Sequence, residues 1–207
     1  MRPPKRIATK NEITKAFESM CIKYPLSKFV RILPVVHAST PLGYGKNPSR
    51  FSPLNGVGEA ATFGIIYGTT DFQTACFEAI VRDVFSYRPK RRLRKLDYKT
   101  KCAINISSKS GSDLSVLDLT NGNSVRYGVP TDVVRHSNHM CGQLFSEFIY
   151  INMKGIDGLL YNSRFTEQRC IAIYDRAIHK IQAVSKVRTL DRNLLETSLS
   201  TWNIHVS

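Results

Sequence analysis

The stretch FGIIYGTTDFQTACFEAIVRDVF, residues 63–85, contains a short apolar run followed by the most regular amphipathic pattern in the chain. Residues 63–67 are apolar and lead into a glycine and two threonines, which is typical of a buried strand. Asp71 stands where the N-cap of a helix is expected. In residues 72–85 apolar side chains recur every four positions, which predicts a helix with one buried face. The segment therefore predicts a strand, a turn and a helix.

Weaker patterns surround this unit. We expect helices at 11–20, with Asn11 as the N-cap, and at 131–151, an extended segment at 28–37 and a long loop at 40–58 that contains three prolines and four glycines. Further strands are expected near 92–97, 103–107, 115–119, 155–161, 170–174 and 178–184. Short strands interspersed with few helices indicate an α+β fold, because the regular alternation of a doubly wound sheet is missing.

The composition fits one folded domain with short appendages. Of the 207 residues 42% are hydrophobic and 10% aromatic, which excludes a disordered chain. No apolar run approaches the roughly 20 residues of a membrane span, and the first residues lack the apolar core of a secretory signal. Five cysteines, an odd number without a CxxC pair, predict reduced thiols in a cytoplasmic protein rather than a disulfide framework or a zinc site.

The net charge of +14 is distributed unevenly. Residues 82–101 contain nine basic and two acidic side chains, and the densest part is RPKRRLRK at 88–95. Such a segment attracts polyanions, so nucleic acid and an acidic partner protein are both open as ligands, beside the alternative of a solvated surface. Direct nucleic-acid binding is not favoured, because no helix-turn-helix signature, RNP motif or zinc finger accompanies the basic run.

Two motifs are weak. GVGEAA at 56–61 matches G-x-G-x-x-A, but a loop precedes it and a strand follows it, whereas a dinucleotide fingerprint follows a strand and opens a helix. His136, His139 and Cys141 have a spacing that would place only the two histidines on one helix face. We expect solvated or capping histidines there and no metal site.

Three polar residues gain meaning from their context. Glu78 lies in the middle of the expected amphipathic helix, where a carboxylate faces either solvent or the rim of a cleft. Arg50 precedes Phe51 near the end of the long loop, and Ser163 follows an expected strand. Each is ordinary alone, and their order along the chain is informative.

Six short blocks in order resemble the RES domain family, which is named for an arginine, a glutamate and a serine. The blocks are FVR at 29–31, RF at 50–51, GIIY at 64–67, TACFE at 74–78, GIDG at 155–158 with YNS at 161–163, and CIAIY at 170–174. The resemblance extends over about residues 29–176. It implies a split β-sheet core with flanking helices, similar to ADP-ribosyltransferases. The corresponding division of the chain is an N-terminal helical extension at 1–28, a catalytic domain at 29–187 and a C-terminal tail at 188–207.

The resemblance also implies a function. Members act as toxins of bacterial toxin–antitoxin pairs and deplete NAD by cleaving the nicotinamide–ribose bond, and the usual antitoxin is a small DNA-binding protein. NAD would be the substrate, inorganic phosphate a candidate co-substrate, and no other cofactor is expected. The acceptor is open among phosphate, water and a protein, and the last would make the chain a mono-ADP-ribosyltransferase. A binding module for nucleic acid, using 88–95, is the alternative outside enzymes.

Roles for five residues follow from the resemblance and from the chemistry. Glu78 would stabilise the positive charge that develops on the ribose. Arg31 and Arg50 would bind the pyrophosphate, because a guanidinium can contact two phosphate oxygens at once. Tyr67 would stack on the nicotinamide or bond to a phosphate, and Ser163 would bind the carboxamide or a phosphate. We expect Glu78, Arg50 and Ser163 to be catalytic.

Overall fold

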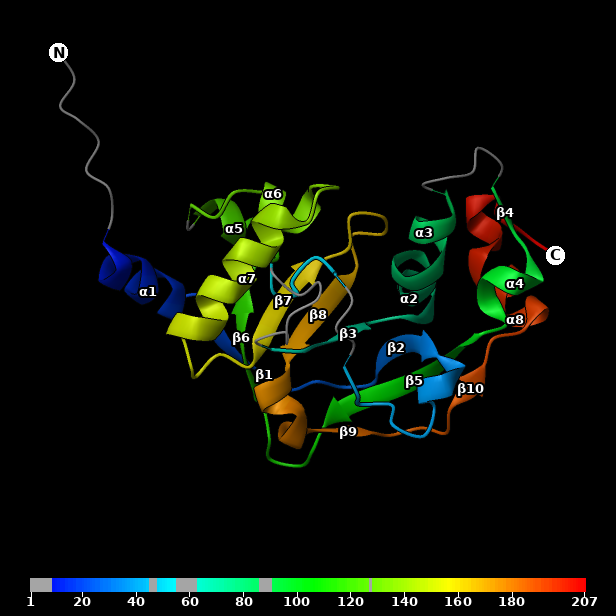
Figure 1. The fold of residues 1–207 in the computed structure, drawn as a ribbon, viewed down its shortest axis with the longest axis horizontal. Coiled ribbons are helices and arrows are strands. Elements are labelled where there is room, and N and C mark those ends of the chain that lie inside the picture. The colour runs from blue at the N-terminus through cyan, green and yellow to red at the C-terminus, as the bar shows by residue number, and fades with distance from the viewer. Residues whose placement is uncertain (1–8, 45–47, 55–62, 86–90, 127) are drawn as a thin grey trace, which may run out of the picture.

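The computed structural model describes residues 9–44, 48–54, 63–85, 91–126 and 128–207 (Figure 1). The motif at 56–61 therefore lies outside the described residues, as does part of the basic run 88–95. All five cysteines are free thiols, and burial raises the pKa of Cys76 to about 12. No helix in the described parts is long and apolar enough to cross a membrane.

The fold is built on one large sheet with helices around it. Nine strands follow the order β1-β6-β7-β8-β3-β2-β5-β10, with β9 paired to β5. All neighbouring pairs in this sheet are antiparallel except β6 and β7. The strands are β1 Cys21–Tyr24, β2 Phe29–Pro34, β3 Ile65–Thr69, β5 Lys101–Ser108, β6 Leu114–Asp118, β7 Gly158–Asn162, β8 Arg169–Tyr174, β9 Ile181–Ala183 and β10 Arg188–Thr189. Two further strands, β4 Arg92–Leu93 and β11 His205–Val206, form a separate parallel pair.

The sheet divides between β3 and β2. These two strands share a single register pair, Val30 with Thr69, whereas β3 pairs with β8 over five residues and β2 with β5 over six. The two halves therefore diverge from this point, and a cavity opens there. The predicted α+β class, a split β-sheet core with flanking helices, is confirmed.

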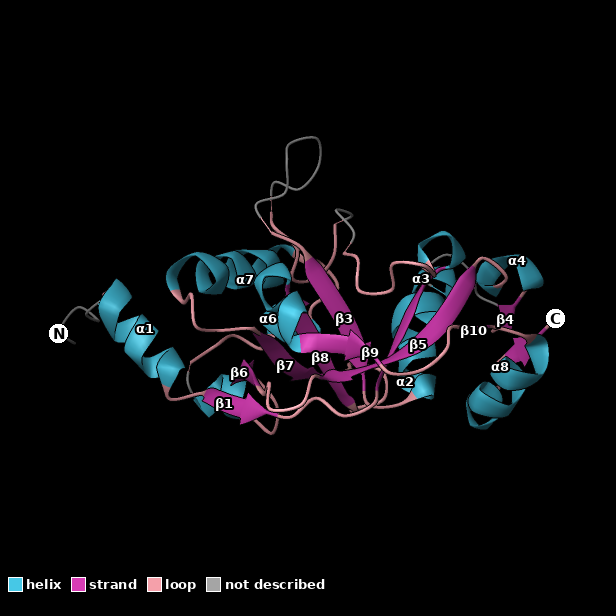
Figure 2. Cartoon of the chain, turned by 90° about the horizontal axis from the view of Figure 1, so that it is seen from below, coloured by secondary structure: helices cyan, strands magenta, loops and turns pink. Residues whose placement is uncertain are grey.

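The helices gather at the two ends of the sheet (Figures 1 and 2). On one side α7 and the short α5 and α6 lie beside β6, β7 and β8, and Phe17 of α1 packs edge-on against Phe145 and Phe148 of α7. On the other side lie α2, α3, α4 and α8. The helices are α1 Lys10–Glu18, α2 Phe72–Cys76, α3 Arg82–Phe85, α4 Lys95–Tyr98, α5 Asn123–Arg126, α6 Asp132–Arg135, α7 Met140–Asn152 and α8 Arg192–Leu199.

The strand–turn–helix unit predicted for 63–85 is confirmed, with one addition. Asp71 caps the helix by accepting a 2.7 Å hydrogen bond from the backbone N–H of Thr74. The helix is continuous, but Phe77–Val81 between α2 and α3 is a π-helical turn, in which the N–H of Arg82 bonds to the carbonyl of Phe77 five residues earlier. Single π turns of this kind are frequent at functional sites.

Two expected elements are wrong in part. Near 92–97 the strand ends after two residues, because the Asp97 carboxylate accepts a 2.8 Å hydrogen bond from the N–H of Arg94 and starts α4. The expected helix at 131–151 is interrupted between α6 and α7, where the His136 ring accepts a 2.9 Å hydrogen bond from the N–H of Asn138. Such local bonds compete with helical ones.

The two ends of the chain contain structure that the patterns do not predict. Thr9, rather than Asn11, caps α1, because Thr9 and Glu12 exchange hydrogen bonds in a capping box. Strand β1 follows that helix. Residues 188–207 contain β10, α8, a 3₁₀ turn and β11, and this segment buries Leu195 and Leu199.

Candidate functional site

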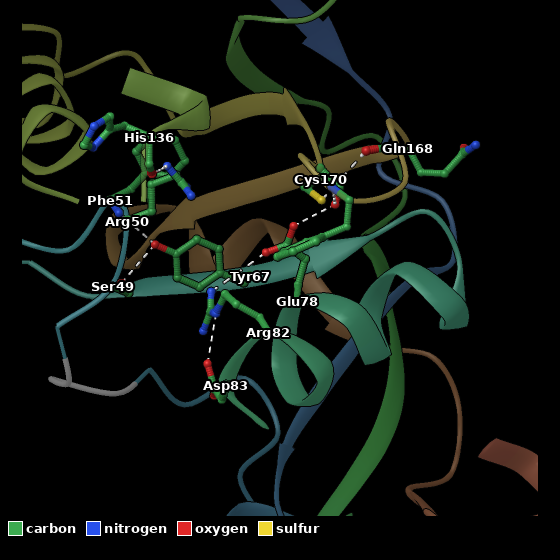
Figure 3. Close-up of polar contacts among 12 residues, drawn as sticks. Ser49, Arg50, Phe51, Tyr67, Glu78, Arg82, Asp83, His136, Gln168 and Cys170 are labelled. Atoms are coloured by element: carbon green, nitrogen blue, oxygen red, sulfur yellow. Dashed lines mark hydrogen bonds and ion pairs between the residues drawn. The ribbon is translucent and has the colours of Figure 1, made fainter. Parts of the chain in front are cut away.

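A cavity of about 190 Å³ opens where the sheet divides, and we call it the split cavity. It lies between β2, β3, the loop before β3 and the helix that contains Glu78. Four of the five predicted site residues line it, namely Arg31, Arg50, Tyr67 and Glu78. These side chains come from positions 31 to 78, and the sheet and the helix bring them together. Figure 3 shows Arg50, Tyr67 and Glu78 of this group.

Tyr67 on β3 holds the loop that presents Arg50. Its hydroxyl accepts a 3.0 Å hydrogen bond from the N–H of Phe51 and lies 3.0 Å from Oγ of Ser49. Arg50 is 8% exposed, and its Nη1 donates a 2.8 Å hydrogen bond to the carbonyl of His136. Because the Tyr67 hydroxyl is occupied by the loop, its ring rather than its hydroxyl is available to a ligand.

Gly142 of α7 allows this loop to lie close to the helix. A Cβ atom at position 142 would be 2.5 Å from the carbonyl oxygen of Arg50 and 2.8 Å from that of Val133. Both atoms belong to the backbone and cannot turn away. A glycine is therefore required here for close approach, not for an unusual backbone conformation.

Glu78 lies on the π turn and is held from two sides. Its Oε1 accepts a 2.7 Å hydrogen bond from the Ser163 hydroxyl, and its Oε2 lies 3.8 Å from Nη1 of Arg82. The carboxylate side chain keeps 21% of its surface exposed. One oxygen is thus fixed by a neutral donor, and the other points toward a cation at the cavity wall.

Ser163 is completely buried, and its hydroxyl also accepts a 3.2 Å hydrogen bond from the N–H of Phe165. Among the described residues the lining of the split cavity does not include it. The structure therefore places Ser163 behind Glu78, where it orients the carboxylate.

Arg31 on β2 is a partly buried cation of the split cavity. Its Nη2 donates a 2.6 Å hydrogen bond to the carbonyl of Gly43, while Nε is buried without a partner among the described residues. Burial lowers the pKa of Arg31 to about 10, so the guanidinium remains charged at neutral pH. A bound anion beside Arg31 would offset the free-energy cost of burying its positive charge.

Cations outnumber anions at the split cavity, since Arg31, Arg50 and Arg82 line it together with Glu78. His139, at the start of α7, has a pKa lowered to about 4, first by burial and then by Arg50, Arg82 and Arg164. A neutral imidazole beside three guanidiniums indicates a site that favours anions. The described residues contain no group of three His, Cys, Asp or Glu side chains that could hold a metal, and His136 and His139 flank the break between α6 and α7.

Comparison with known proteins identifies the chain. A family model for the RES domain matches residues 28–194, most of the sequence. The chain belongs to the RES domain family. The match begins one residue before β2 and ends within α8, so it includes every residue that lines the split cavity.

Two relatives of this RES domain chain are informative. "Probable toxin y4kH" from Sinorhizobium fredii is 31% identical over 78 residues, which cover 38% of this chain and 61% of that protein. The match thus spans less than two thirds of the relative. The fold is similar to the crystal structure of the M. tuberculosis MbcT–MbcA toxin–antitoxin complex, with a TM-score of 0.67 and 14% identity over 91% of this chain and 97% of the other.

The structure adds two residues to the RES site that sequence reasoning missed. Arg82 lines the split cavity and faces Glu78 one turn earlier, and the i, i+4 spacing of opposite charges was a usable signal. Tyr161 is 6% exposed, lines the same cavity and packs edge-on against Phe51 at 5.0 Å between ring centroids. Tyr161 begins the YNS block of the resemblance, but neither that block nor the strand pattern predicts that its side chain lines the cavity.

Proposed function

We propose that this RES domain chain is the toxin of a toxin–antitoxin pair and consumes NAD by cleaving the bond between nicotinamide and ribose. One observation carries the proposal: Glu78 shares a single small cavity with Arg31, Arg50 and Tyr67. A carboxylate among guanidiniums suits a substrate that carries phosphates and develops positive charge on a sugar during reaction.

The chemistry requires electrostatic stabilisation more than a strong acid. The C1′–N bond breaks with its electron pair going to the positively charged pyridinium ring, so nicotinamide leaves neutral and needs no proton. Positive charge then develops on the ribose, and the Glu78 carboxylate, fixed by the hydroxyl of Ser163, would stabilise it without rearranging. A new bond forms between C1′ and an acceptor oxygen, and the acceptor releases its proton.

The arginines would bind and position the pyrophosphate. Arg50 is anchored by the His136 carbonyl and Arg31 by the Gly43 carbonyl, so both guanidiniums are held before a ligand arrives. Preorganised donors cost little ordering on binding. Ser163 acts in this scheme as a positioning residue for Glu78 rather than as a substrate contact.

Product analysis tests the proposal directly. The purified chain is incubated with NAD, with and without phosphate, and the products are identified by mass. Nicotinamide with ADP-ribose indicates water as the acceptor, ADP-ribose phosphate indicates phosphate, and a protein carrying ADP-ribose indicates a transferase. Intact NAD under all conditions, together with steeply salt-dependent binding to random DNA, would replace the proposal with the nucleic-acid alternative.

The partner would be an antitoxin encoded with the chain. The names of both relatives support this part, since one is a probable toxin and the other was solved as a toxin–antitoxin complex. Expression of the chain should arrest bacterial growth, and expression of Glu78→Gln should not. Equal growth arrest by the two chains would contradict the link between NAD cleavage and toxicity.

A further inference from the structure

A second cavity of about 330 Å³ lies beside the split cavity, and we call it the aromatic cavity. Four aromatic side chains line it, namely Phe77, Phe85, Phe165 and Trp202. The ring of Phe77 is stacked on Phe165 at 6.0 Å between centroids and lies edge-on to Trp202 at 4.8 Å. Trp202 comes from the C-terminal segment after α8, which lies beside the helix that contains Phe77 (Figure 1). The C-terminal segment thus completes a pocket with flat apolar walls.

The two cavities adjoin through one helix. Arg82 lines both of them, and the consecutive residues Phe77 and Glu78 on the π turn line the aromatic and the split cavity respectively. Ser163, which holds Glu78, is followed by Arg164 and Phe165 of the aromatic cavity. The two cavities are therefore neighbours on either side of Arg82.

The charge of the aromatic cavity is positive. Arg82, Arg91 and Arg164 line it, and its lining among the described residues includes no acidic side chain. The guanidinium carbon of Arg164 lies 4.8 Å from the centroid of the Phe165 ring, and its Nε is buried without a partner in the described part of the chain. A buried donor that lacks an acceptor is costly, and a ligand oxygen would satisfy it.

The split cavity alone is too small for a dinucleotide. Its volume of about 190 Å³ falls below the roughly 300 Å³ at which pockets begin to enclose drug-sized ligands. Resting on the proposed function, we infer that the aromatic cavity binds the adenylate half of NAD, with the adenine against Phe165 and Trp202 and its phosphate among Arg82, Arg91 and Arg164. Aromatic rings stack on bases, and guanidiniums bind phosphate.

Trp202 permits a direct test, because it is the single tryptophan of the chain and is 37% exposed. AMP is titrated into the full-length protein while tryptophan fluorescence is followed. We expect a saturable change, and a dissociation constant raised about fivefold by Arg91→Ala, the effect of losing one exposed ionic contact. Arg92→Ala is the matched control, since this neighbouring exposed arginine does not line the cavity. The Arg92→Ala protein should bind AMP as tightly as the parent does.

Turnover gives a second readout. Trp202→Ala should lower kcat/KM for NAD about tenfold relative to kcat/KM for nicotinamide mononucleotide, which lacks the adenylate half. Fluorescence without any change at millimolar AMP, or equal AMP affinity in Arg91→Ala and Arg92→Ala, overturns the assignment. A fluorescence change only when an antitoxin is added would also overturn it and assign the cavity to the partner protein. AMP binding does not need NAD cleavage, so failure of this subsite and failure of the proposed function are distinguishable.

Discussion

The hydroxyl of Ser163 donates a 2.7 Å hydrogen bond to Oε1 of Glu78, and this bond joins the end of β7 to the π turn of the helix. The two residues are 85 positions apart in sequence, and the serine is completely buried. A carboxylate that keeps one oxygen bound to a buried donor has few orientations left. The arrangement fixes the second oxygen at the wall of the split cavity.

Ser163→Ala should therefore impair catalysis through Glu78. The hydrogen bond is charge-assisted, and such bonds contribute about 1.5–3 kcal/mol, so we expect kcat for NAD to fall about tenfold or more. KM should change little, because Ser163 does not line the cavity. Steady-state kinetics with separate kcat and KM measure this. A rise in KM at constant kcat would instead indicate that Ser163 contacts the substrate. Ser124→Ala in α5 is a control for removing a buried hydroxyl elsewhere.

Glu78→Gln should abolish most NAD cleavage without unfolding the protein. Glutamine keeps an oxygen that can accept from Ser163 but lacks the charge that stabilises the ribose, so we expect the rate to fall about 10²–10³-fold. Nicotinamide release and thermal unfolding are measured on the same preparation. Glu18→Gln, the same change at an exposed position of α1, should leave both unchanged. A Glu78→Gln protein as active as the parent would remove Glu78 from the mechanism.

The sequence predicts the strand–turn–helix unit well, because each of its signals is local. Asp71 caps the helix, and apolar residues at 76, 77, 80 and 81 form its buried face. Glu78 follows Tyr67 by eleven residues in the sequence. The ordered blocks that resemble the RES family place Arg31 and Arg50 as well. Local patterns and their order along the chain are therefore sufficient to predict these residues of the split cavity.

The remaining features depend on contacts that no local pattern contains. The π turn at Phe77–Val81 inserts one residue into the helical register, and the period of the apolar positions does not predict it. Trp202 reaches Phe77 because α8 folds back onto the domain, and a local pattern at 188–207 does not predict where that helix packs. The position of Ser163 behind Glu78, rather than in the cavity, depends on the packing of the helix on the end of β7.

Gly142→Ala should destabilise the fold and displace Arg50. Alanine raises helix propensity by about 1 kcal/mol, but its Cβ would contact two backbone oxygens at 2.5 and 2.8 Å, and such overpacking costs about 1–3 kcal/mol. We expect a net loss of stability, measured by urea unfolding, and a lower affinity for NAD. Gly155→Ala is the matched control, since a Cβ there meets nothing within 4 Å, and it should be neutral or slightly stabilising. Equal effects of the two substitutions would contradict the close approach.

His139 should make the stability of the protein depend on pH between about 6.5 and 4. The pKa of His139 is about 4 in the folded chain, below its ordinary value near 6.5, so in this window the unfolded chain binds the proton and the folded chain does not. Protonation therefore favours unfolding, and the stability present above pH 6.5 is lost as the pH falls toward 4. The cause is burial and the three guanidiniums of Arg50, Arg82 and Arg164, against which Asp83 acts weakly.

His139→Gln tests this directly, because glutamine does not titrate. The full shift would correspond to about 3 kcal/mol, and since the ring is only half-buried we expect solvent screening to reduce the effect to about 1–2 kcal/mol. The free energy of unfolding in urea should fall less between pH 7 and pH 5 for the variant than for the parent. His179→Gln provides the control, at an exposed histidine far along the chain from this turn. The guanidiniums lower the pKa of His139, so an anion that neutralises them should raise it. This is measured by NMR titration of His139 in the Glu78→Gln protein, with and without NAD. We expect a higher pKa of His139 when NAD is bound. An unchanged pKa would place the pyrophosphate away from Arg50, Arg82 and Arg164.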